Sequence, residues 1–101
     1  MEQAQVQRRL VAILASDMVG YSRLMEIDEA GTFARLKAHR LELIDPSIVK
    51  NKGRIIKTTG DGMLVEFSSA IEAAQCALEV QRRMAMRNAD VEPDRQIHFR
   101  I

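Results

Sequence analysis

The segment RIIKTTGDGMLVEF, residues 54–67, predicts a β-hairpin, and this hairpin decides how the rest of the chain is arranged. β-Branched and other apolar residues occur in both arms, residues 54–59 and 63–67, and the Asp-Gly pair between them is a strong hairpin signal. We therefore expect two antiparallel strands joined around Gly60-Asp61-Gly62.

The segments before the hairpin predict one strand and a helical region. Residues 10–15 form a continuous apolar run, which indicates a strand buried on both faces. A loop around residues 19–26 follows, and a helix then begins at Asp28 or Glu29. Asp45-Pro46 interrupts that helix and predicts a kink or a second short helix ending near Gly53. Its apolar positions recur at roughly helical spacing: Phe33, Leu36, Leu41, Ile44 and Ile48.

The segments after the hairpin predict one more helix and one more strand. Ser69 and Glu72 fit a capping box at the start of a helix. Cys76 lies in that helix and is expected to be a small buried apolar residue. A polar loop spans residues 88–94, and residues 97–101 begin a strand. The apolar face of the helix consists of Ala73, Ala77, Val80 and Met84.

The predicted element order is βαββαβ, which indicates an α+β, ferredoxin-like sheet with helices packed on one face. Right-handed crossovers place the first and second strands parallel, with the third strand between them. The end of the first strand then lies beside the hairpin turn. We therefore expect Asp17, at the end of the first strand, and Asp61, in the turn, to lie close together.

Length and composition limit the classes of protein that are possible. A chain of 101 residues makes one domain, which we expect to span residues 9–101 after a flexible tail of residues 1–8. A formal net charge of +1 provides no footprint for nucleic acid or an anionic membrane. No apolar run approaches the roughly 20 residues of a membrane span. One cysteine and no signal-like opening make the cytoplasm the expected location.

The paired aspartates suggest chemistry on a nucleotide. Mg²⁺ prefers hard oxygen ligands and is typically held by one or two carboxylates together with substrate phosphates. Two such metals about 4 Å apart can assist an in-line displacement at phosphorus. The backbone N–H groups of residues 18–22 are a candidate phosphate cradle. Lys57 either donates to a purine ring acceptor or is a solvated charge on an exposed face.

At these residues the chain resembles the catalytic domain of class III adenylate and guanylate cyclases, in particular the bacterial homodimeric adenylate cyclases. The resemblance rests on two segments, ASDMVGYS at residues 15–22 and KTTGDG at residues 57–62, and it covers residues 9–101. It implies ATP as the substrate, with GTP the weaker candidate, and cyclic AMP and pyrophosphate as the products. It also implies two Mg²⁺ or Mn²⁺ ions per site and a head-to-tail homodimer.

The resemblance assigns roles residue by residue. Asp17 and Asp61 would be the catalytic metal ligands, with the Met18 carbonyl as a further ligand. Lys57 would help select adenine, in the active site of the other subunit. Thr59 and Gly60 would lie near the nucleotide. The triphosphate would be contacted by Val19, Gly20, Tyr21 and Ser22.

The resemblance also implies that the family's catalytic domain continues beyond the strand at residues 97–101. The continuing part would hold the second base-selecting residue and the asparagine and arginine that stabilise the transition state. Loss of one preorganised donor commonly costs about 10² to 10³ in rate. We therefore expect the 101-residue chain to fold but scarcely to cyclise ATP.

Other interpretations remain open. Taken alone, Asp61 is a turn residue and Asp17 a capping residue at the end of a strand. A non-catalytic relative that binds nucleotide or dimerises is one alternative. A palm-type enzyme such as a diguanylate cyclase or a polymerase is another, although no Gly-Gly-Asp-Glu-Phe-like hairpin occurs. His39 and His98 lack partners at ligand spacing. The arginines near the end of the second long helix are expected to be solvated there: Arg82, Arg83, Arg87 and Arg95.

Overall fold

The computed structural model describes residues 10–101, so the predicted tail of residues 1–8 lies outside the described residues. A four-stranded sheet has the order β2-β3-β1-β4, and each neighbouring pair is antiparallel. β1 and β2 are therefore parallel with β3 between them, as the crossover argument predicts. The strands are β1 (Ala12–Met18), β2 (Arg54–Thr58), β3 (Gly62–Phe67) and β4 (Phe99–Arg100).

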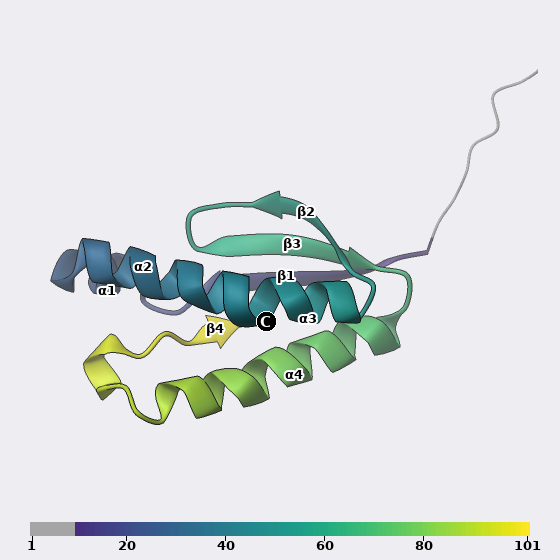
Figure 1. The fold of residues 1–101 in the computed structure, drawn as a ribbon. Helices are drawn as coiled ribbons and strands as arrows, with labels where there is room; N and C mark the ends of the chain where they lie inside the picture. Colours follow the sequence, from purple (N-terminus) through teal and green to yellow (C-terminus); the bar gives the residue numbers. More distant parts are fainter. Residues whose placement is uncertain (1–9) are drawn as a thin grey trace, which may run out of the picture.

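Helices α2, α3 and α4 pack on one face of the sheet (Figure 1). This arrangement confirms the predicted ferredoxin-like α+β fold. Among residues 10–101, no helix combines the length and the apolar composition that crossing a bilayer requires. The helical segments are α1 (Tyr21–Ile27), α2 (Glu29–His39), a π-helical segment (Arg40–Ile44), α3 (Asp45–Lys50), α4 (Ala70–Asn88) and a 3₁₀ turn (Pro93–Arg95).

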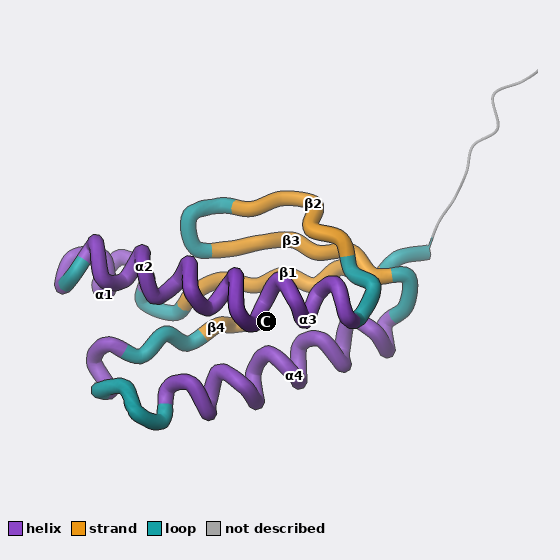
Figure 2. Tube along the Cα trace, in the orientation of Figure 1, coloured by secondary structure: helices purple, strands orange, loops and turns teal. Residues whose placement is uncertain are grey.

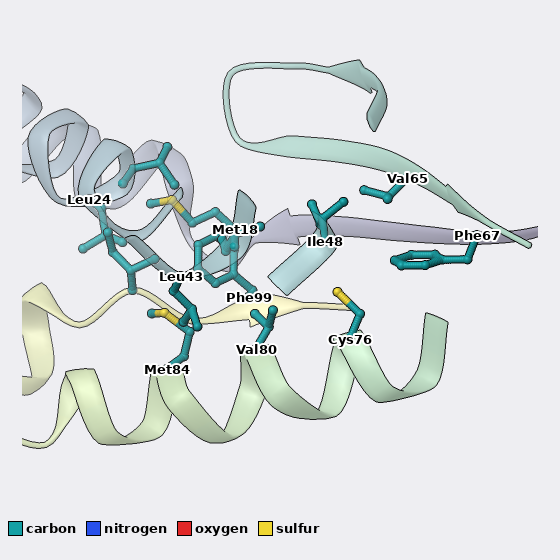
Figure 3. Packing of buried hydrophobic residues seen from close by; sticks show 13 residues of the cluster. Met18, Leu24, Leu43, Ile48, Val65, Phe67, Cys76, Val80, Met84 and Phe99 are labelled. Carbon is teal, nitrogen blue, oxygen red and sulfur yellow. The ribbon is translucent and has the colours of Figure 1, made fainter. Parts of the chain in front are cut away.

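The hydrophobic core lies between the sheet and these helices (Figure 3). Val65 and Phe67 of β3 point into it, and Cys76 of α4 is 1% exposed, as predicted. Full burial of one such side chain is worth about 1.5–3 kcal/mol, so this layer holds the helices on the sheet. The other labelled core residues are Met18, Leu24, Leu43, Ile48, Val80, Met84 and Phe99.

The first strand differs from the prediction in position and in burial. β1 begins at Ala12 and continues to Met18, so Asp17 lies within the strand. Ile13 is 51% exposed, because helices cover only one face of the sheet among the described residues. The prediction of a strand buried on both faces is wrong for this chain.

The region after β1 is helical where a loop was predicted. α1 occupies Tyr21–Ile27, and Gly20 precedes it with φ of +65°. The start of α2 is predicted correctly, because the Asp28 carboxylate accepts a hydrogen bond from the Gly31 N–H at 3.0 Å. No polar side chain caps α1 in this way, which explains why the sequence pattern did not indicate it.

α3 (Asp45–Lys50) is the predicted second short helix with Pro46 in its first turn, and the π-helical segment joins it to α2 without a non-helical break. Pro46 has no N–H to donate to the preceding turn. That turn is wider than an α-turn, and the Asp45 N–H donates to the Arg40 carbonyl, five residues earlier. The π-helical segment accommodates the proline without a break.

Two residues assigned to the buried face of this region are exposed instead. Phe33 is 61% exposed and Leu41 is 59% exposed. Thr32 takes the neighbouring buried position, because its hydroxyl donates to the Leu24 carbonyl at 3.0 Å and is satisfied there. The remaining predicted positions, Leu36, Ile44 and Ile48, are buried as expected.

The predictions after the hairpin are confirmed in outline. Ser69 caps α4 by accepting a hydrogen bond from the Glu72 N–H at 3.2 Å, and its hydroxyl donates to the Glu72 carboxylate at 3.1 Å. Val80 and Met84 lie on the buried face of α4. The last strand is shorter than predicted, with two residues, Phe99–Arg100.

A polar cluster of His39, Glu42 and Arg87 joins the end of α2 to the end of α4. Arg87 Nε donates to His39 Nδ1 at 2.9 Å, and Arg87 Nη2 lies 2.6 Å from Glu42 Oε1. The prediction that Arg87 is simply solvated is wrong. His39, to which no role was assigned, is 8% exposed and accepts this hydrogen bond.

The His39 contact predicts a pH-dependent stability. Burial is the main cause that lowers the pKa of His39 below its ordinary value of 6.5. The positive charges of Arg87 and Arg35 lower this pKa further, whereas the negative charge of Glu42 raises it. The unfolded chain therefore takes up this proton first as the pH falls. We expect the free energy of unfolding, measured by urea denaturation, to decrease as the pH falls from 7.5 to 5.5.

His39→Gln tests the assignment, because a glutamine oxygen can accept from Arg87 but does not titrate. The decrease between pH 7.5 and 5.5 should become smaller in this variant. His98→Gln is the control, since His98 is exposed and contacts Gln96 at the surface. An unchanged pH profile in His39→Gln would contradict the assignment.

Candidate functional site

The register between β1 and β3 brings the two predicted aspartates to one end of the sheet. Asp17 lies opposite Gly62, the residue directly after Asp61. Asp17, Lys57 and Asp61 line one open cavity of about 500 Å³. The convergence expected from topology is therefore present.

The hairpin turn that carries Asp61 is held by its own hydrogen bonds. The Thr59 N–H donates to the Gly62 carbonyl at 2.8 Å, and the Gly62 N–H donates to Thr59 Oγ1 at 3.0 Å. Gly62 also lies very close to β1, because a Cβ atom at this position would be 2.8 Å from the Ser16 carbonyl oxygen. The absence of a side chain at Gly62 lets the turn approach Asp17.

The loop between β1 and α1 lies against the same turn. Gly20 precedes α1, and its carbonyl accepts from the Leu24 N–H at 3.0 Å. A Cβ atom on Gly60 would be 3.3 Å from the Tyr21 hydroxyl, so Tyr21 lies beside the turn. The first N–H groups of a helix have no acceptor within the helix, which leaves those at Tyr21 and Ser22 to face other groups. The Val19 N–H is already used, because it donates to the His98 carbonyl at 2.8 Å.

Met18 lies in the strand rather than at the open end of the site. It pairs with Phe99 of β4, and its side chain is 1% exposed in the core. Only its backbone can therefore take part in a site at the sheet end.

Lys57 occupies β2 opposite Leu64, next to an irregularity in the β2–β3 pairing. Lys57 is exposed, so its ammonium group is open to solvent.

Arg100 is a site residue that the sequence analysis missed. β4 pairs with β1 so that Arg100 lies opposite Asp17, and its Nε and Nη2 donate to the two Asp17 carboxylate oxygens at 2.8 and 3.2 Å. These contacts with Asp17 raise the pKa of Arg100, and the charge of Asp61 adds to the effect. The only sequence signal was that Arg100 belongs to a predicted strand, which does not reveal its neighbour.

The site thus combines two carboxylates with two cationic side chains. Within residues 10–101, no group of three or more His, Cys, Asp or Glu side chains is arranged to hold a metal ion. Among the described residues that line this cavity, only Asp17 and Asp61 carry carboxylates, and Arg100 neutralises part of their charge. Carboxylate oxygens are the hard ligands that Mg²⁺ takes in proteins.

Comparison with known proteins identifies relatives of this chain. No family model matches it. It is 48% identical over 101 residues to "Putative adenylate cyclase 3" of Rhizobium meliloti (strain 1021), which covers all of this chain and 17% of that protein. The chain therefore corresponds to a small part of this curated relative.

Solved structures show the same fold. The crystal structure of an adenylate/guanylate cyclase/hydrolase from Silicibacter pomeroyi is 52% identical, with a TM-score of 0.85, over 93% of this chain and 55% of that chain. The guanylyl cyclase Cya2 is 21% identical with a TM-score of 0.71, over 88% of this chain and 50% of that one. A bacterial light-regulated adenylyl cyclase is 19% identical with a TM-score of 0.75, over 88% and 48%. The last two support the fold alone.

The close approach at Gly62 generates a prediction about stability. Gly62→Ala should lower the free energy of unfolding by about 1–3 kcal/mol, because the added methyl group forces β3 away from β1. Gly60→Ala is the matched control, since its nearest neighbour is the end of the Tyr21 side chain at 3.3 Å. Urea denaturation measures both variants, and equal losses would show that the β1 contact does not limit position 62.

Proposed function

The chain is homologous to part of the nucleotide cyclase domains, and on that premise we propose that it forms the N-terminal part of a class III cyclase catalytic domain. In the complete protein this domain converts ATP to cyclic AMP and pyrophosphate. The observation that supports the proposal most directly is the position of Asp17 opposite Gly62, which sets two carboxylates at the end of one sheet. We also propose that the protein is cytoplasmic, where it has access to nucleoside triphosphates for this reaction.

The donor set at the sheet end fits Mg²⁺ or Mn²⁺. Asp17 and Asp61 offer hard carboxylate oxygens, and the Arg100 guanidinium stands where a cation neutralises Asp17. We propose two ions per site, held by these aspartates and the Met18 carbonyl. When bound, the ions would neutralise phosphate charge and make the ribose hydroxyl a better nucleophile.

The chain's own groups would bind and orient the nucleotide. The backbone N–H groups of Gly20, Tyr21 and Ser22 would donate to phosphate oxygens at the start of α1. Arg100, once released from Asp17, would lie beside the same cavity as a second cation for the phosphates. The Thr59 N–H fixes the turn by its hydrogen bond to the Gly62 carbonyl, and Gly60 lies beside the Tyr21 hydroxyl.

The proposed reaction is an intramolecular displacement. The ribose 3′-oxygen forms a bond to the α-phosphorus, the bond from that phosphorus to the bridging oxygen breaks, and pyrophosphate leaves with its electron pair. The proton of the 3′-hydroxyl is lost to the medium. No external nucleophile adds, so the products are cyclic AMP and pyrophosphate.

Base selection and dimerisation complete the proposal. Lys57 lies on β2, exposed to solvent, and would donate to the adenine of a nucleotide bound mainly by a second subunit. ATP is therefore the proposed substrate, with GTP as the alternative that a comparison of turnover would distinguish. In the proposed homodimer, the Lys57 and the Asp61 of one subunit would serve different active sites, although both line the same cavity of the single chain.

Arg100 generates a prediction for metal binding. Because a divalent ion must displace the guanidinium from Asp17, Arg100→Ala should bind Mn²⁺ about two- to fivefold more tightly in calorimetric titration. Arg54→Ala is the control, since Arg54 pairs with Glu66 on the same sheet and does not contact Asp17. The double variant Asp17→Asn, Asp61→Asn should lose binding. Weaker binding by Arg100→Ala would contradict the exchange.

The proposed activity is tested in the full-length parent protein. Asp61→Asn should lower cyclic AMP formation from ATP by at least about 100-fold, because it removes a metal ligand rather than an outer-shell partner. The 101-residue chain should bind Mn²⁺ with ATP but form little cyclic AMP. Wild-type levels of product from Asp61→Asn would exclude this aspartate from the reaction.

A further inference from the structure

β4 is the shortest strand of the described sheet, and it carries Arg100 to Asp17. It forms one edge of the sheet and, among the described residues, pairs only with β1, through Phe99 and Arg100. In Figure 2 it is the short orange segment between β1 and α4. Beside this ladder, the His98 carbonyl accepts from the Val19 N–H at 2.8 Å. So short a ladder leaves room for other contacts to decide where β4 lies.

The carbonyl groups of this segment alternate between two partners. The His98 carbonyl faces β1, whereas the carbonyls of Ile97 and Phe99 accept hydrogen bonds from α4. Gln81 Nε2 donates to the Phe99 oxygen at 2.7 Å. Asn88 Nδ2 donates to the Ile97 oxygen at 2.8 Å. Two side-chain amides of α4 therefore occupy carbonyls that an edge strand otherwise leaves open to a neighbouring strand.

We propose that Gln81 is a positioning residue for the candidate site. Its amide holds the Phe99 carbonyl, and the next residue, Arg100, is thereby kept on the Asp17 carboxylate. Gln81 contacts no reacting group and acts only through β4. The consequence for metal binding rests on the proposed function, whereas the contact itself needs neither metal nor nucleotide.

The ion pair between Arg100 and Asp17 does not fix β4 by itself. Both side chains are exposed, by 69% and 47%. Exposed ion pairs contribute about 0–1 kcal/mol, because water competes for the charges and two flexible side chains must be ordered. The hydrogen bond from Gln81 is of similar weight, since one such bond contributes about 0.5–1.5 kcal/mol net. Its loss should therefore change how often Arg100 contacts Asp17.

Gln81 can be replaced without disturbing the core, unlike Asn88. Asn88 is 6% exposed, and its carbonyl accepts from Gln96 Nε2 at 3.1 Å. Replacing Asn88 would leave a buried carbonyl of Ile97 without its donor, which is costly. Gln81 is exposed and lines an open surface cavity, so a different side chain there leaves no buried void. Gln81 is therefore the residue whose contact can be removed selectively.

The experiment records the arginine Nε–H signals of the 101-residue chain, without metal, by nuclear magnetic resonance. Gln81→Met removes the donor but keeps the length and helix propensity of the side chain. The Arg100 Nε–H should then exchange with water about two- to tenfold faster. Its signal should move toward the position found in Asp17→Ala, where the carboxylate is absent. The Arg87 Nε–H, which donates to His39, should not change. An unchanged Arg100 signal in Gln81→Met would overturn the proposal.

Two further variants separate the lost hydrogen bond from a general disturbance of α4. Gln75→Met makes the same substitution at another exposed position of α4 that has no hydrogen bond within residues 10–101, and it should leave the Arg100 signal unchanged. Gln81→Lys keeps a donor that can reach the Phe99 oxygen and should retain most of the wild-type signal. A change as large as that of Gln81→Met in either variant would refute the role of the hydrogen bond. Because no metal is present, failure here leaves the proposed metal site to be judged by its own Mn²⁺ titration.

Discussion

The pairing of β1 with β3 is the constraint on which the rest of the structure depends. The register runs from Ala12 opposite Phe67 to Asp17 opposite Gly62, so one end joins the core and the other forms the site. A shift by one residue would turn every side chain of β1 to the opposite face and separate Asp17 from Arg100. β2 and β4 attach to either side of this pair, and they bring Lys57 and Arg100 to the same end of the sheet.

The helix starts and the turn that the sequence predicts correctly are those with a local polar signal. Asp28 and Ser69 cap their helices, and Asp-Gly marks the hairpin, because in each case the residue and the backbone group it serves are neighbours in the chain. α1 has no such cap and was taken for a loop. The π-helical segment depends on how the chain accommodates Pro46, and Thr32 is buried because a distant carbonyl of Leu24 accepts its hydroxyl. Neither follows from apolar periodicity.

The same difference between local signals and long-range contacts decides which residues of the candidate site could be predicted. Topology alone brings Asp17 and Asp61 together, because the handedness of the crossover fixes which strand ends meet. Arg100 and the pair of His39 with Arg87 were missed, since each contact joins residues far apart in the chain. Patterning indicated that these residues lie on a strand or a helix, but their partners depend on register and on how α2 packs against α4. Long-range polar contacts are therefore the part that three-dimensional structure adds.

Arg100 also bears on the energetics of the sheet end. The carboxylates of Asp17 and Asp61 lie at adjacent strand ends and repel each other. The Arg100 guanidinium offsets this repulsion, because it donates two hydrogen bonds to Asp17 and is also attracted by the charge of Asp61. In the proposed metal site, a divalent ion at the same oxygens would have to replace this interaction, so its affinity would be lower than the carboxylates alone would give. Arg100 stabilises the end of β1 and holds the Asp17 carboxylate in position. The hairpin turn carries Thr59, Asp61 and Gly62, which line a cavity on each of its sides.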